Sequence, residues 1–254
     1  LSIRRQRQMC IRDRHQLKDK PGFEYLDANG TIRYPAIRRV VVTHQHSDHI
    51  GGLEEMALMN TFIFAHPDTG KPFKPQLISS VNILNDLWDQ SLKGGLNTIQ
   101  GRYALLQDYF FILSLRPGDE GKDRFLLLKR YRVSLFPTDH VQIERKYDWP
   151  SYGVFIEDTV SKESVFFSGD TRFDWPAYGP LMERATLCFH DVQLAEAVSA
   201  VHASIGELRT MPPAVKRKTW LYHYGDEWDS GPYHTVPEEF AGFVPPQERM
   251  QVLP

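Results

Sequence analysis

The chain has 254 residues, of which 41% are hydrophobic and 24% are charged, and its formal net charge is −2 at pH 7. This composition suits one compact domain or two small ones. No apolar run approaches the roughly 18 residues that cross a bilayer, and no signal peptide opens the chain, so we expect a cytoplasmic protein with no membrane partner. Cys10 and Cys188 are far apart and form no CxxC pair, so any metal should have histidine and carboxylate ligands.

The first 14 residues, LSIRRQRQMCIRDR, carry five arginines and one aspartate with no helical or strand periodicity. They fit either a disordered basic tail or a non-native segment that resembles translated adaptor sequence, and we favour the second. Without them a net charge of +4 is removed, which leaves −6 on residues 15–254, the expected single domain. This acidic body argues against a broad surface for nucleic acid.

Segments rich in β-branched and apolar residues predict strands along the chain. They cover residues 38–44, 61–67, 125–140, 152–158, 164–170, 186–191 and 219–225. Helical patterns occupy residues 51–59 and the region around 204–211, where Ser204 and Glu207 have the spacing of a capping box. The result is a mixed α/β chain. Nearly every predicted strand ends at a histidine or an aspartate, and such strand ends can gather distant residues in one cleft.

The segment VVVTHQHSDHIGG, residues 40–52, places three histidines and an aspartate directly after a run of valines. His44 and His46 can turn the same way, while Asp48 and His49 can face a second point nearby. Imidazole and carboxylate ligands suit zinc, manganese or iron, and the two glycines that follow let the backbone turn close to a ligand. The segment therefore predicts half of a two-metal cage, and the alternative is an incidental polar loop.

THQHSDHIGG resembles the HxHxDH motif of the metallo-β-lactamase superfamily, and the resemblance extends from about residue 38 onward. It implies an α/β fold of the αββα sandwich type, truncated at the N-terminus because only PGFEYLDANGTIRYPAI precedes the motif. It also implies two divalent metal ions, zinc first and manganese second. Their ligands would be His44, His46 and His140 on one ion, Asp48, His49 and His223 on the other, and Asp170 as the bridge. Two such ions activate a bridging water for in-line displacement, so we expect hydrolysis.

Two further segments, CFHDVQ and VHASIGEL, resemble the His-Glu and His-Ser-Thr elements of the phosphodiesterase branch that includes ribonuclease Z. The resemblance implies that His202 donates a proton to the departing oxygen or stabilises the phosphorane, and that Asp191 orients and charges His202. Asp191 replaces the more usual glutamate and is one methylene shorter, and a helix-entry role is the alternative for His202. The remaining histidines are expected to be packed or surface residues: His15, His66, His190 and His234.

Within this branch the chain most resembles the phage anti-Pycsar phosphodiesterases and their bacterial relatives, which open cyclic pyrimidine and purine mononucleotides. The resemblance rests on HDVQL, VHASIGEL, LYHYGDEW, DLWDQSLKGGLNTI and LQDYFFIL. In that group a loop of one subunit closes over the active site of its twin, which implies a homodimer and a lid around residues 85–132. The aromatic candidates for that surface are Trp88, Tyr103, Tyr109, Phe110 and Phe111. Ordinary core packing is the alternative, above all for YFFIL.

We therefore expect a dinuclear-metal-dependent phosphodiesterase that hydrolyses a nucleotide, above all a cyclic mononucleotide, by attack of a metal-bound hydroxide. The expected catalytic residues are Asp48, Asp170, Asp191 and His202. The enzymatic alternative is a ribonuclease Z-like RNA 3′-processing endonuclease, but residues 69–132 show no clear RNA-gripping arm. The ten basic against six acidic residues of this segment suit a mononucleotide phosphate as well as an RNA backbone. The non-enzymatic alternative is a metal-binding scaffold or an inactive pseudoenzyme.

Overall fold

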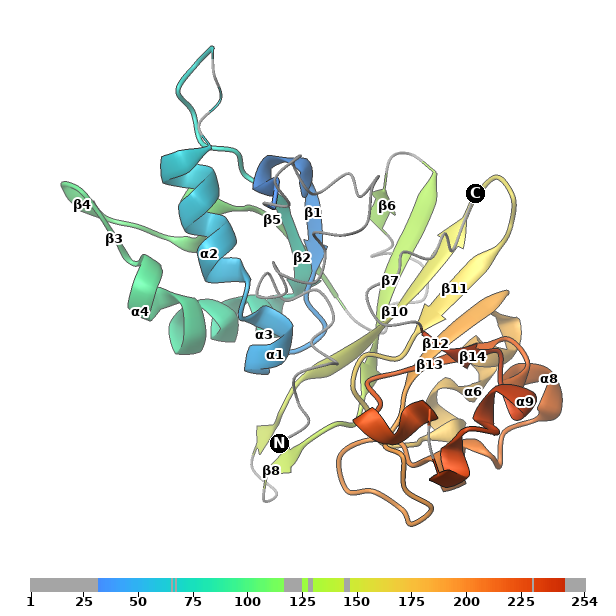
Figure 1. The fold of residues 1–254 in the computed structure, drawn as a ribbon. Helices are drawn as coiled ribbons and strands as arrows, with labels where there is room; N and C mark the ends of the chain where they lie inside the picture. The colour runs from blue at the N-terminus through green and yellow to red at the C-terminus, as the bar shows by residue number, and fades with distance from the viewer. Residues whose placement is uncertain are drawn as a thin grey trace. The chain divides into compact units, whose positions relative to one another are not determined.

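The computed structural model of the chain (Figure 1) describes residues 32–64, 66, 68–116, 125–127, 130–143, 147–229 and 231–244. These residues fall into two compact units, an N-terminal unit that runs to Leu115 and a C-terminal unit that begins at Arg116. The basic tail of residues 1–14 lies outside the described residues. The assignment of residues 15–254 to a single domain stays a prediction.

The N-terminal unit is built on a parallel sheet in the order β1-β2-β5. Its strands are β1 (Arg39–Val41), β2 (Gln76–Ser80) and β5 (Phe111–Leu115). The middle strand β2 is buried over most of its length, as expected for a parallel strand covered on both faces. Only β1 was predicted from the sequence, because the serines and glutamine of β2 and β5 interrupt their apolar runs.

Short helices and one hairpin complete this unit. In chain order they are η2 (Tyr34–Ala36), α1 (Ser47–Ile50), α2 (Leu53–Leu58), η3 (Met59–Ile63), α3 (Val81–Asp86), η4 (Leu87–Leu92), α4 (Lys93–Leu96), β3 (Thr98–Ile99), β4 (Arg102–Tyr103) and α5 (Leu106–Tyr109).

The strand predicted at residues 61–67 is wrong, because residues 61–63 belong to the helical turn η3, which continues α2. Leu53, Met56, Ala57 and Asn60 are all buried, which is the spacing of one helix face. Burial of this stripe outweighs the strand preference of the β-branched and aromatic residues in TFIF, a preference that depends strongly on context.

The C-terminal unit contains a sheet in the order β14-β13-β12-β11-β10-β7-β6. Its strands are β6 (Phe125–Leu127), β7 (Tyr131–Thr138), β10 (Ser151–Asp158), β11 (Ser164–Phe167), β12 (Leu187–Asp191), β13 (Thr219–Tyr222) and β14 (Gly242–Phe243), and a separate hairpin pairs β8 (Gln142–Ile143) with β9 (Tyr147–Asp148). Strands β11 to β14 are parallel, and β10 is antiparallel to both β11 and β7. Strand β7 therefore runs in the same direction as β11, β12 and β13, and the carboxyl ends of all four lie at one edge of the sheet.

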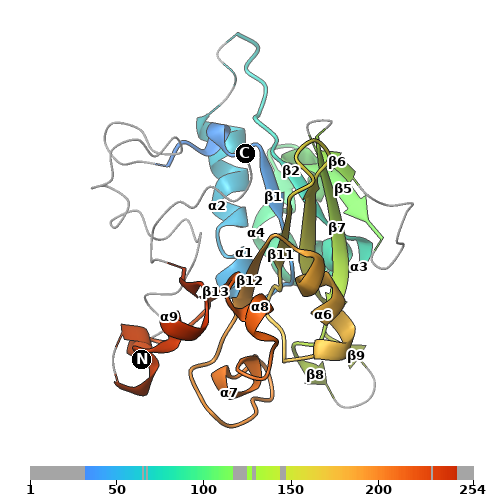
Figure 2. The same ribbon diagram turned by 90° about the vertical axis from the view of Figure 1, so that its right-hand side faces the viewer.

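Alternation along these strands divides their side chains between two faces. Phe166, Cys188 and Leu221 belong to the larger core cluster, which also contains buried residues of the helices. Phe189 and Tyr222, each next in sequence to one of these, belong to a smaller cluster on the other face. The helical elements are α6 (Trp175–Arg184), α7 (Ile205–Leu208), α8 (Pro213–Lys216), η5 (Asp226–Asp229), η6 (Gly231–Tyr233) and α9 (Val236–Glu239). Figures 1 and 2 show α6, α8 and α9 gathered beside strands β12 and β13.

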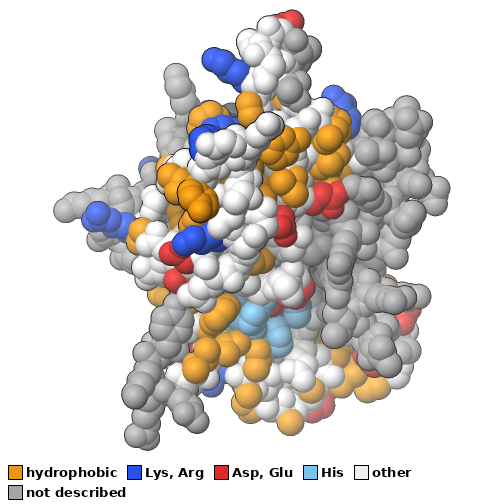
Figure 3. All heavy atoms as spheres, turned by 90° about the vertical axis from the view of Figure 1, so that its left-hand side faces the viewer, with side chains coloured by type: hydrophobic (Ala, Val, Ile, Leu, Met, Phe, Trp, Pro, Cys, Tyr) orange, Lys and Arg blue, Asp and Glu red, His pale blue; other side chains and the backbone are white. Residues whose placement is uncertain are grey.

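The aromatic residues proposed for a lid divide between core and surface. Tyr109 and Phe110 are each 1% exposed, and the hydroxyl of Tyr109 donates to the carbonyl oxygen of Leu96 at 2.7 Å, so these two belong to the core of the N-terminal unit. Tyr103 and Phe111 are 82% and 64% exposed. Figure 3, which faces this unit, shows hydrophobic side chains gathered at its surface. Core packing is therefore correct for the first part of YFFIL only.

Among the residues that the structure describes, no helix is both long enough and apolar enough to span a bilayer.

An ion pair in the C-terminal unit, between the half-buried Arg130 and the buried Asp158, predicts how the free energy of unfolding depends on pH in acid. The Arg130 guanidinium donates to both carboxylate oxygens of Asp158, from Nε at 3.0 and 2.9 Å and from Nη2 at 2.5 Å, and the N–H of Val160 donates at 2.9 Å. These bonds, Arg130 first, hold the pKa of Asp158 well below its ordinary value of 3.8. Because the folded pKa is lowered, this contribution is complete above the unfolded pKa and is lost as pH falls through the folded pKa.

We therefore expect Asp158→Asn to lower the free energy of unfolding at about pH 6, and the difference from wild type to shrink as the pH falls below the unfolded pKa. Urea unfolding at several pH values measures this. Asp229→Asn, at an exposed aspartate, is the matched control. A difference between Asp158→Asn and wild type that does not change with pH would show that the pair contributes no such linkage.

Candidate metal centre

The first group of predicted ligands leaves the N-terminal sheet directly after β1. The exit is held by the N–H of Val42, which donates to Ile78 at 3.0 Å, and by the Ser79 hydroxyl, which donates to the carbonyl oxygen of Val42 at 2.6 Å. His44 follows and is fully buried. The strand pairing thus fixes where the HxHxDH segment begins.

Four predicted ligands gather within this short segment. Helix α1 begins after its N-cap His46 and has four residues, so that Asp48 and His49 both lie in its single turn. The ring centroid of His44 lies 4.8 Å from that of His46 and 4.1 Å from that of His49. His44 Nε2 is 3.1 Å from His46 Nδ1, and His49 Nε2 is 3.5 Å from Asp48 Oδ2. Three imidazoles and a carboxylate therefore crowd one point of the N-terminal unit.

Gly51 is required where α1 ends. A Cβ atom at this position would lie 2.5 Å from the carbonyl oxygen of Ser47, which is closer than real Cβ contacts allow. The prediction that glycine lets the backbone turn here has this steric basis.

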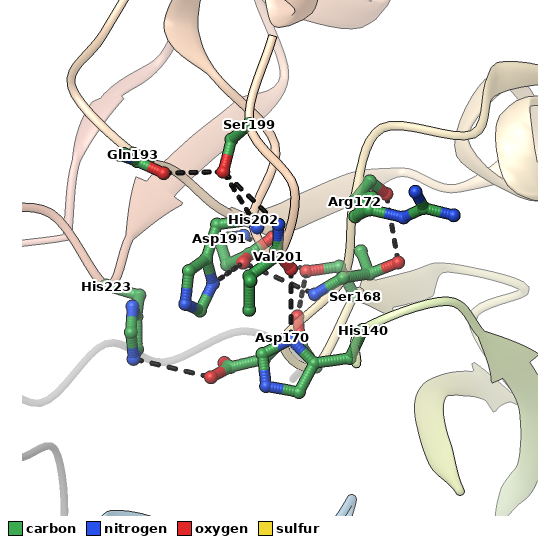
Figure 4. Close-up of polar contacts among 12 residues, drawn as sticks. His140, Ser168, Asp170, Arg172, Asp191, Gln193, Ser199, Val201, His202 and His223 are labelled. Carbon is green, nitrogen blue, oxygen red and sulfur yellow. Dashed lines mark hydrogen bonds and ion pairs between the residues drawn. The ribbon is translucent and has the colours of Figure 1, made fainter. Parts of the chain in front are cut away.

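The second group of predicted site residues lies at the carboxyl edge of the C-terminal sheet. His140 follows β7, Asp170 follows β11, Asp191 is the last residue of β12, and His223 follows β13. Figure 4 shows His140, Asp170, Asp191 and His223 together with His202 at this edge. The strand directions bring these residues together although up to 83 positions separate them in the sequence.

A buried network holds the loop that presents Asp170. Gly169 has a φ of +63°, a conformation that favours glycine. The Tyr222 hydroxyl donates to the carbonyl oxygen of Gly169 at 2.7 Å and lies 3.0 Å from the Ser168 hydroxyl. Burial first, and then the charge of Asp191, raises the pKa of Tyr222 well above its ordinary value, so Tyr222 remains a neutral donor. Ser151 donates to the Asp170 carbonyl oxygen at 3.1 Å.

His223 adopts a strained backbone conformation with a φ of +63°. A non-glycine residue in the left-handed region is uncommon, and such residues cluster at functional sites. Nε2 of His223 lies 3.4 Å from Oδ2 of Asp170, an interaction drawn in Figure 4. The backbone of the turn after β13 therefore aims this imidazole at the Asp170 carboxylate.

His140 is oriented by a main-chain acceptor. Its Nδ1 lies 3.0 Å from the carbonyl oxygen of Val201, and a carbonyl oxygen only accepts, so Nδ1 carries the hydrogen. The lone pair of the ring is then on Nε2. A hydrogen bond of this kind fixes the tautomer and ring direction of a metal-ligating histidine.

Asp191 and His202 form a close pair. His202 Nδ1 lies 2.7 Å from Asp191 Oδ2, which also accepts from the N–H of Thr171 at 3.3 Å. The His202 ring stacks on His223 with centroids 4.7 Å apart and an interplanar angle of 26°. The Asp191 side chain is fully buried, whereas His202 is 21% exposed. The shorter aspartate therefore reaches His202 as a glutamate was expected to do.

The helix after His202 begins with the predicted capping box. Ser204 accepts from the N–H of Glu207 at 3.2 Å, and the Glu207 carboxylate accepts from the N–H of Ser204 at 2.9 Å. This motif fixes the direction of the chain just past His202. The interpretation of His202 as only a helix-entry residue does not account for its bond to Asp191.

The donor sets fit divalent metal ions. In the C-terminal unit, one ligand atom from each of His140, Asp170 and His202 lies within 4.8 Å of the others, so His202 is a possible ligand that the sequence did not indicate. Imidazole and carboxylate ligands of this kind suit zinc and manganese. Cys188 is buried in the core, and burial raises its pKa to about 11, so it offers no thiolate.

The predicted ligands thus divide between the two units. His44, His46, Asp48 and His49 belong to the N-terminal unit, and His140, Asp170 and His223 belong to the C-terminal unit. Each group is assembled by its own sheet. Their union in one dinuclear centre stays a prediction.

The other histidines agree with their interpretation as packed or surface residues, where they are described. His190 is fully buried, His66 and His234 are exposed, and His15 lies outside the described residues. Sequence analysis missed three polar residues whose hydroxyl groups contact residues next to the predicted site residues, namely Ser168, Tyr178 and Tyr222. An isolated serine or tyrosine, whether at a strand end or in a helix, carries no local signal of such a role.

Comparisons with known proteins show which proteins this chain is similar to. Residues 24–250 match the family described as Anti-Pycsar protein Apyc1. The Anti-Pycsar protein Apyc1 of Paenibacillus harenae is 34% identical over 222 residues, which cover 87% of this chain and 81% of that protein. That of Bacillus phage vB_BsuM-Goe3 is 37% identical over 191 residues, with coverages of 74% and 68%. The crystal structure of the metallo-beta-lactamase fold protein YhfI from Bacillus subtilis gives a TM-score of 0.55 at 15% identity, covering 85% of this chain and 77% of that chain.

The fold and the strand-end histidines and aspartates define a metal-dependent hydrolase of the metallo-β-lactamase fold. The chain belongs to the anti-Pycsar protein Apyc1 family, because the match spans most of its length. The fold class and the family predicted from the sequence are confirmed.

Proposed function

We propose that the chain hydrolyses the phosphodiester of a cyclic mononucleotide, with two divalent metal ions bound by the seven predicted ligands. The observation that carries this proposal is the buried Asp191 carboxylate paired with His202 at 2.7 Å, beside the predicted ligands His140, Asp170 and His223. Metal ligands alone would suit many hydrolases of this fold. The adjacent Asp–His pair adds a proton carrier, which an unactivated ribose oxygen needs when it departs.

The family supports a cyclic nucleotide rather than a long RNA. The relatives in Paenibacillus harenae and in Bacillus phage vB_BsuM-Goe3 carry the name Anti-Pycsar protein, and the resemblance of the sequence implies cyclic pyrimidine or purine mononucleotides. The net charge of −2 also favours a small substrate over a polyanion.

The bound ions, zinc first and manganese second, would supply Lewis acidity and a nucleophile at neutral pH. His140 would bind through Nε2, because Nδ1 donates to Val201. Asp170 would bridge the ions, and Asp48 would help to hold the attacking water. His202 would give a proton from Nε2 to the leaving oxygen, since its Nδ1 faces Asp191. The buried Asp191 carboxylate would stabilise the imidazolium form of His202.

The purified chain tests this proposal directly. It is loaded with zinc or manganese and incubated separately with cyclic UMP, CMP, AMP and GMP, and with a precursor tRNA that carries a 3′ trailer. We expect chromatography to show opening of at least one cyclic mononucleotide, its loss after chelation, and its return when metal is added back.

Other outcomes identify the alternatives. Trailer removal with the cyclic nucleotides intact would make the chain a ribonuclease Z-like endonuclease. Metal binding with no turnover of any substrate would make it a scaffold or a pseudoenzyme.

The same proposal includes a homodimer with a lid around residues 85–132. Among the described side chains of this segment, Tyr103 and Phe111 are exposed aromatic residues that could meet a twin subunit. Sedimentation equilibrium should give twice the mass of one chain, and Phe111→Asp should shift the equilibrium toward the monomer. A monomer at all concentrations would contradict the dimer without affecting the chemistry proposed above.

A further inference from the structure

A histidine that the chemistry above does not use lies directly behind the Asp–His pair. His190 is fully buried on β12, on the face of the sheet where Phe166 and Cys188 pack into the core. An apolar side chain would fill such a position without the cost of burying polar nitrogens. Both ring nitrogens of His190 instead have polar neighbours, which is the condition under which a buried imidazole is tolerated.

The first nitrogen of His190 faces Asp191. Its Nδ1 lies 2.8 Å from the main-chain carbonyl oxygen of Asp191 and 3.3 Å from Oδ1 of the same residue. A carbonyl oxygen only accepts hydrogen bonds, so Nδ1 carries a hydrogen. That hydrogen lies between the main chain and the carboxylate of Asp191.

The second nitrogen of His190 is held by Tyr178. Nε2 lies 3.0 Å from the Tyr178 hydroxyl, which accepts from the N–H of Asp174 at 2.9 Å and lies 3.1 Å from the carbonyl oxygen of Arg172. Burial raises the pKa of Tyr178 far above its ordinary value, so the hydroxyl stays neutral. Helix α6 thus supplies a fixed anchor for the ring of His190.

We propose that His190, anchored by Tyr178, is a positioning residue that sets the orientation of the Asp191 carboxylate and, through it, that of His202. Oδ2 of Asp191 accepts hydrogen bonds from His202 and from the N–H of Thr171, while Oδ1 faces Nδ1 of His190. Oδ1 accepts no hydrogen bond, and the polar Nδ1–H of His190, 3.3 Å away, favours this orientation of the carboxylate over one that is turned about its last bond. His190 touches neither substrate nor metal and acts only through Asp191.

This positioning role predicts a selective effect on the kinetics of the enzyme. The kinetic prediction rests on the proposed function, because it is measured as activity on a cyclic nucleotide. Without the Nδ1 hydrogen, Asp191 can turn, and His202 spends less time oriented for proton transfer. The loss should therefore appear in kcat for a cyclic nucleotide and not in KM. A substrate with a nitrophenolate leaving group needs no proton and should be little affected.

Two amide substitutions separate the two nitrogens of His190. The side-chain nitrogen of asparagine can occupy the place of Nδ1, and that of glutamine the place of Nε2. We expect His190→Gln to lower kcat for the cyclic nucleotide by about 10- to 100-fold, as loss of a supporting hydrogen bond typically does, and His190→Asn to recover most of it. Tyr178→Phe, which deletes one hydroxyl, should cause a smaller loss of the same kind.

The decisive control is bis(4-nitrophenyl) phosphate, for which all three variants should keep nearly the wild-type rate. Equal losses in His190→Asn and His190→Gln, or parallel losses on both substrates, would show that His190 serves only the packing of the core.

Imidazole NMR of the zinc-loaded protein tests the same inference without turnover. The resonance of the His202 Nδ1 hydrogen should move in His190→Gln and stay near its wild-type position in His190→Asn. If wild type opened no cyclic nucleotide, the proposed function would fail, but this spectrum would still test the positioning role of His190. An unchanged His202 resonance in both variants would overturn that positioning role.

Discussion

Replacing Asp170 with alanine is expected to abolish turnover and to remove metal at the same time. Asp170 is 2% exposed, its carboxylate lies 3.4 Å from His223, and its main chain is held by Ser151 and the Gly169 turn. A bridging ligand serves both ions, so its loss should lower the metal content from two ions per chain to one or none. The rate should fall to that of the reaction without enzyme, because the nucleophile depends on the ions.

Metal content by plasma mass spectrometry and the change of Tm on adding zinc measure this result. A ligand that binds only the folded state raises Tm by an amount that grows with the logarithm of its concentration relative to Kd, so the rise seen for wild type should shrink in Asp170→Ala. Asp229→Ala, at an exposed aspartate, is the matched control and should behave as wild type. Full metal content in an inactive Asp170→Ala would exclude the bridging role.

Replacing His202 with alanine is expected to separate catalysis from metal binding. His202 donates from Nδ1 to a buried carboxylate, which leaves Nε2 to exchange a proton with the leaving oxygen. Loss of a general acid typically costs about 10²- to 10⁴-fold in rate, and we expect that range for a cyclic nucleotide. The two ions should remain, because three other residues of the C-terminal unit are the predicted ligands.

The leaving group provides the internal control for His202→Ala. A nitrophenyl phosphodiester should lose much less activity than the cyclic nucleotide, since nitrophenolate departs without a proton. His234→Ala replaces an exposed histidine and should leave both rates unchanged. If His202→Ala instead loses metal, the grouping of His202 with His140 and Asp170 reflects coordination, and the proton must come from another residue.

The two substitutions together also distinguish the proposed function from its alternatives. A scaffold would lose metal in Asp170→Ala but would show no rate for His202→Ala to change. A ribonuclease Z-like enzyme would show both effects on the tRNA trailer and neither on a cyclic nucleotide.

Local patterns predicted much of the C-terminal sheet. Strands β10, β11, β12 and β13 were recognised because each is a compact run of apolar residues that ends in polar ones. The capping box at Ser204 was predicted from its spacing alone, because its two hydrogen bonds join residues three positions apart. Such contacts depend on little beyond neighbouring residues.

Prediction failed where distant contacts outweigh local preference. Residues 61–63 continue a helix because the stripe from Leu53 to Asn60 is buried, although TFIF favours a strand. Strands β2 and β5 were missed because pairing with β1 completes them, despite their interrupted apolar runs. Tyr109 of YFFIL is likewise held in the core by its hydrogen bond to the carbonyl oxygen of Leu96, a contact that the local pattern does not contain.

For the site, the sequence by itself determined the chemistry of the residues, because HxHxDH spacing and the residue type at each strand end are local properties of the chain. The tertiary structure decided which of them meet. The bond from His202 to Asp191, the approach of His223 to Asp170 and the anchoring of His190 by Tyr178 all join different elements. Their distances depend on strand order, on register and on a left-handed turn at His223, and these are set by the burial of the whole sheet rather than by any one segment.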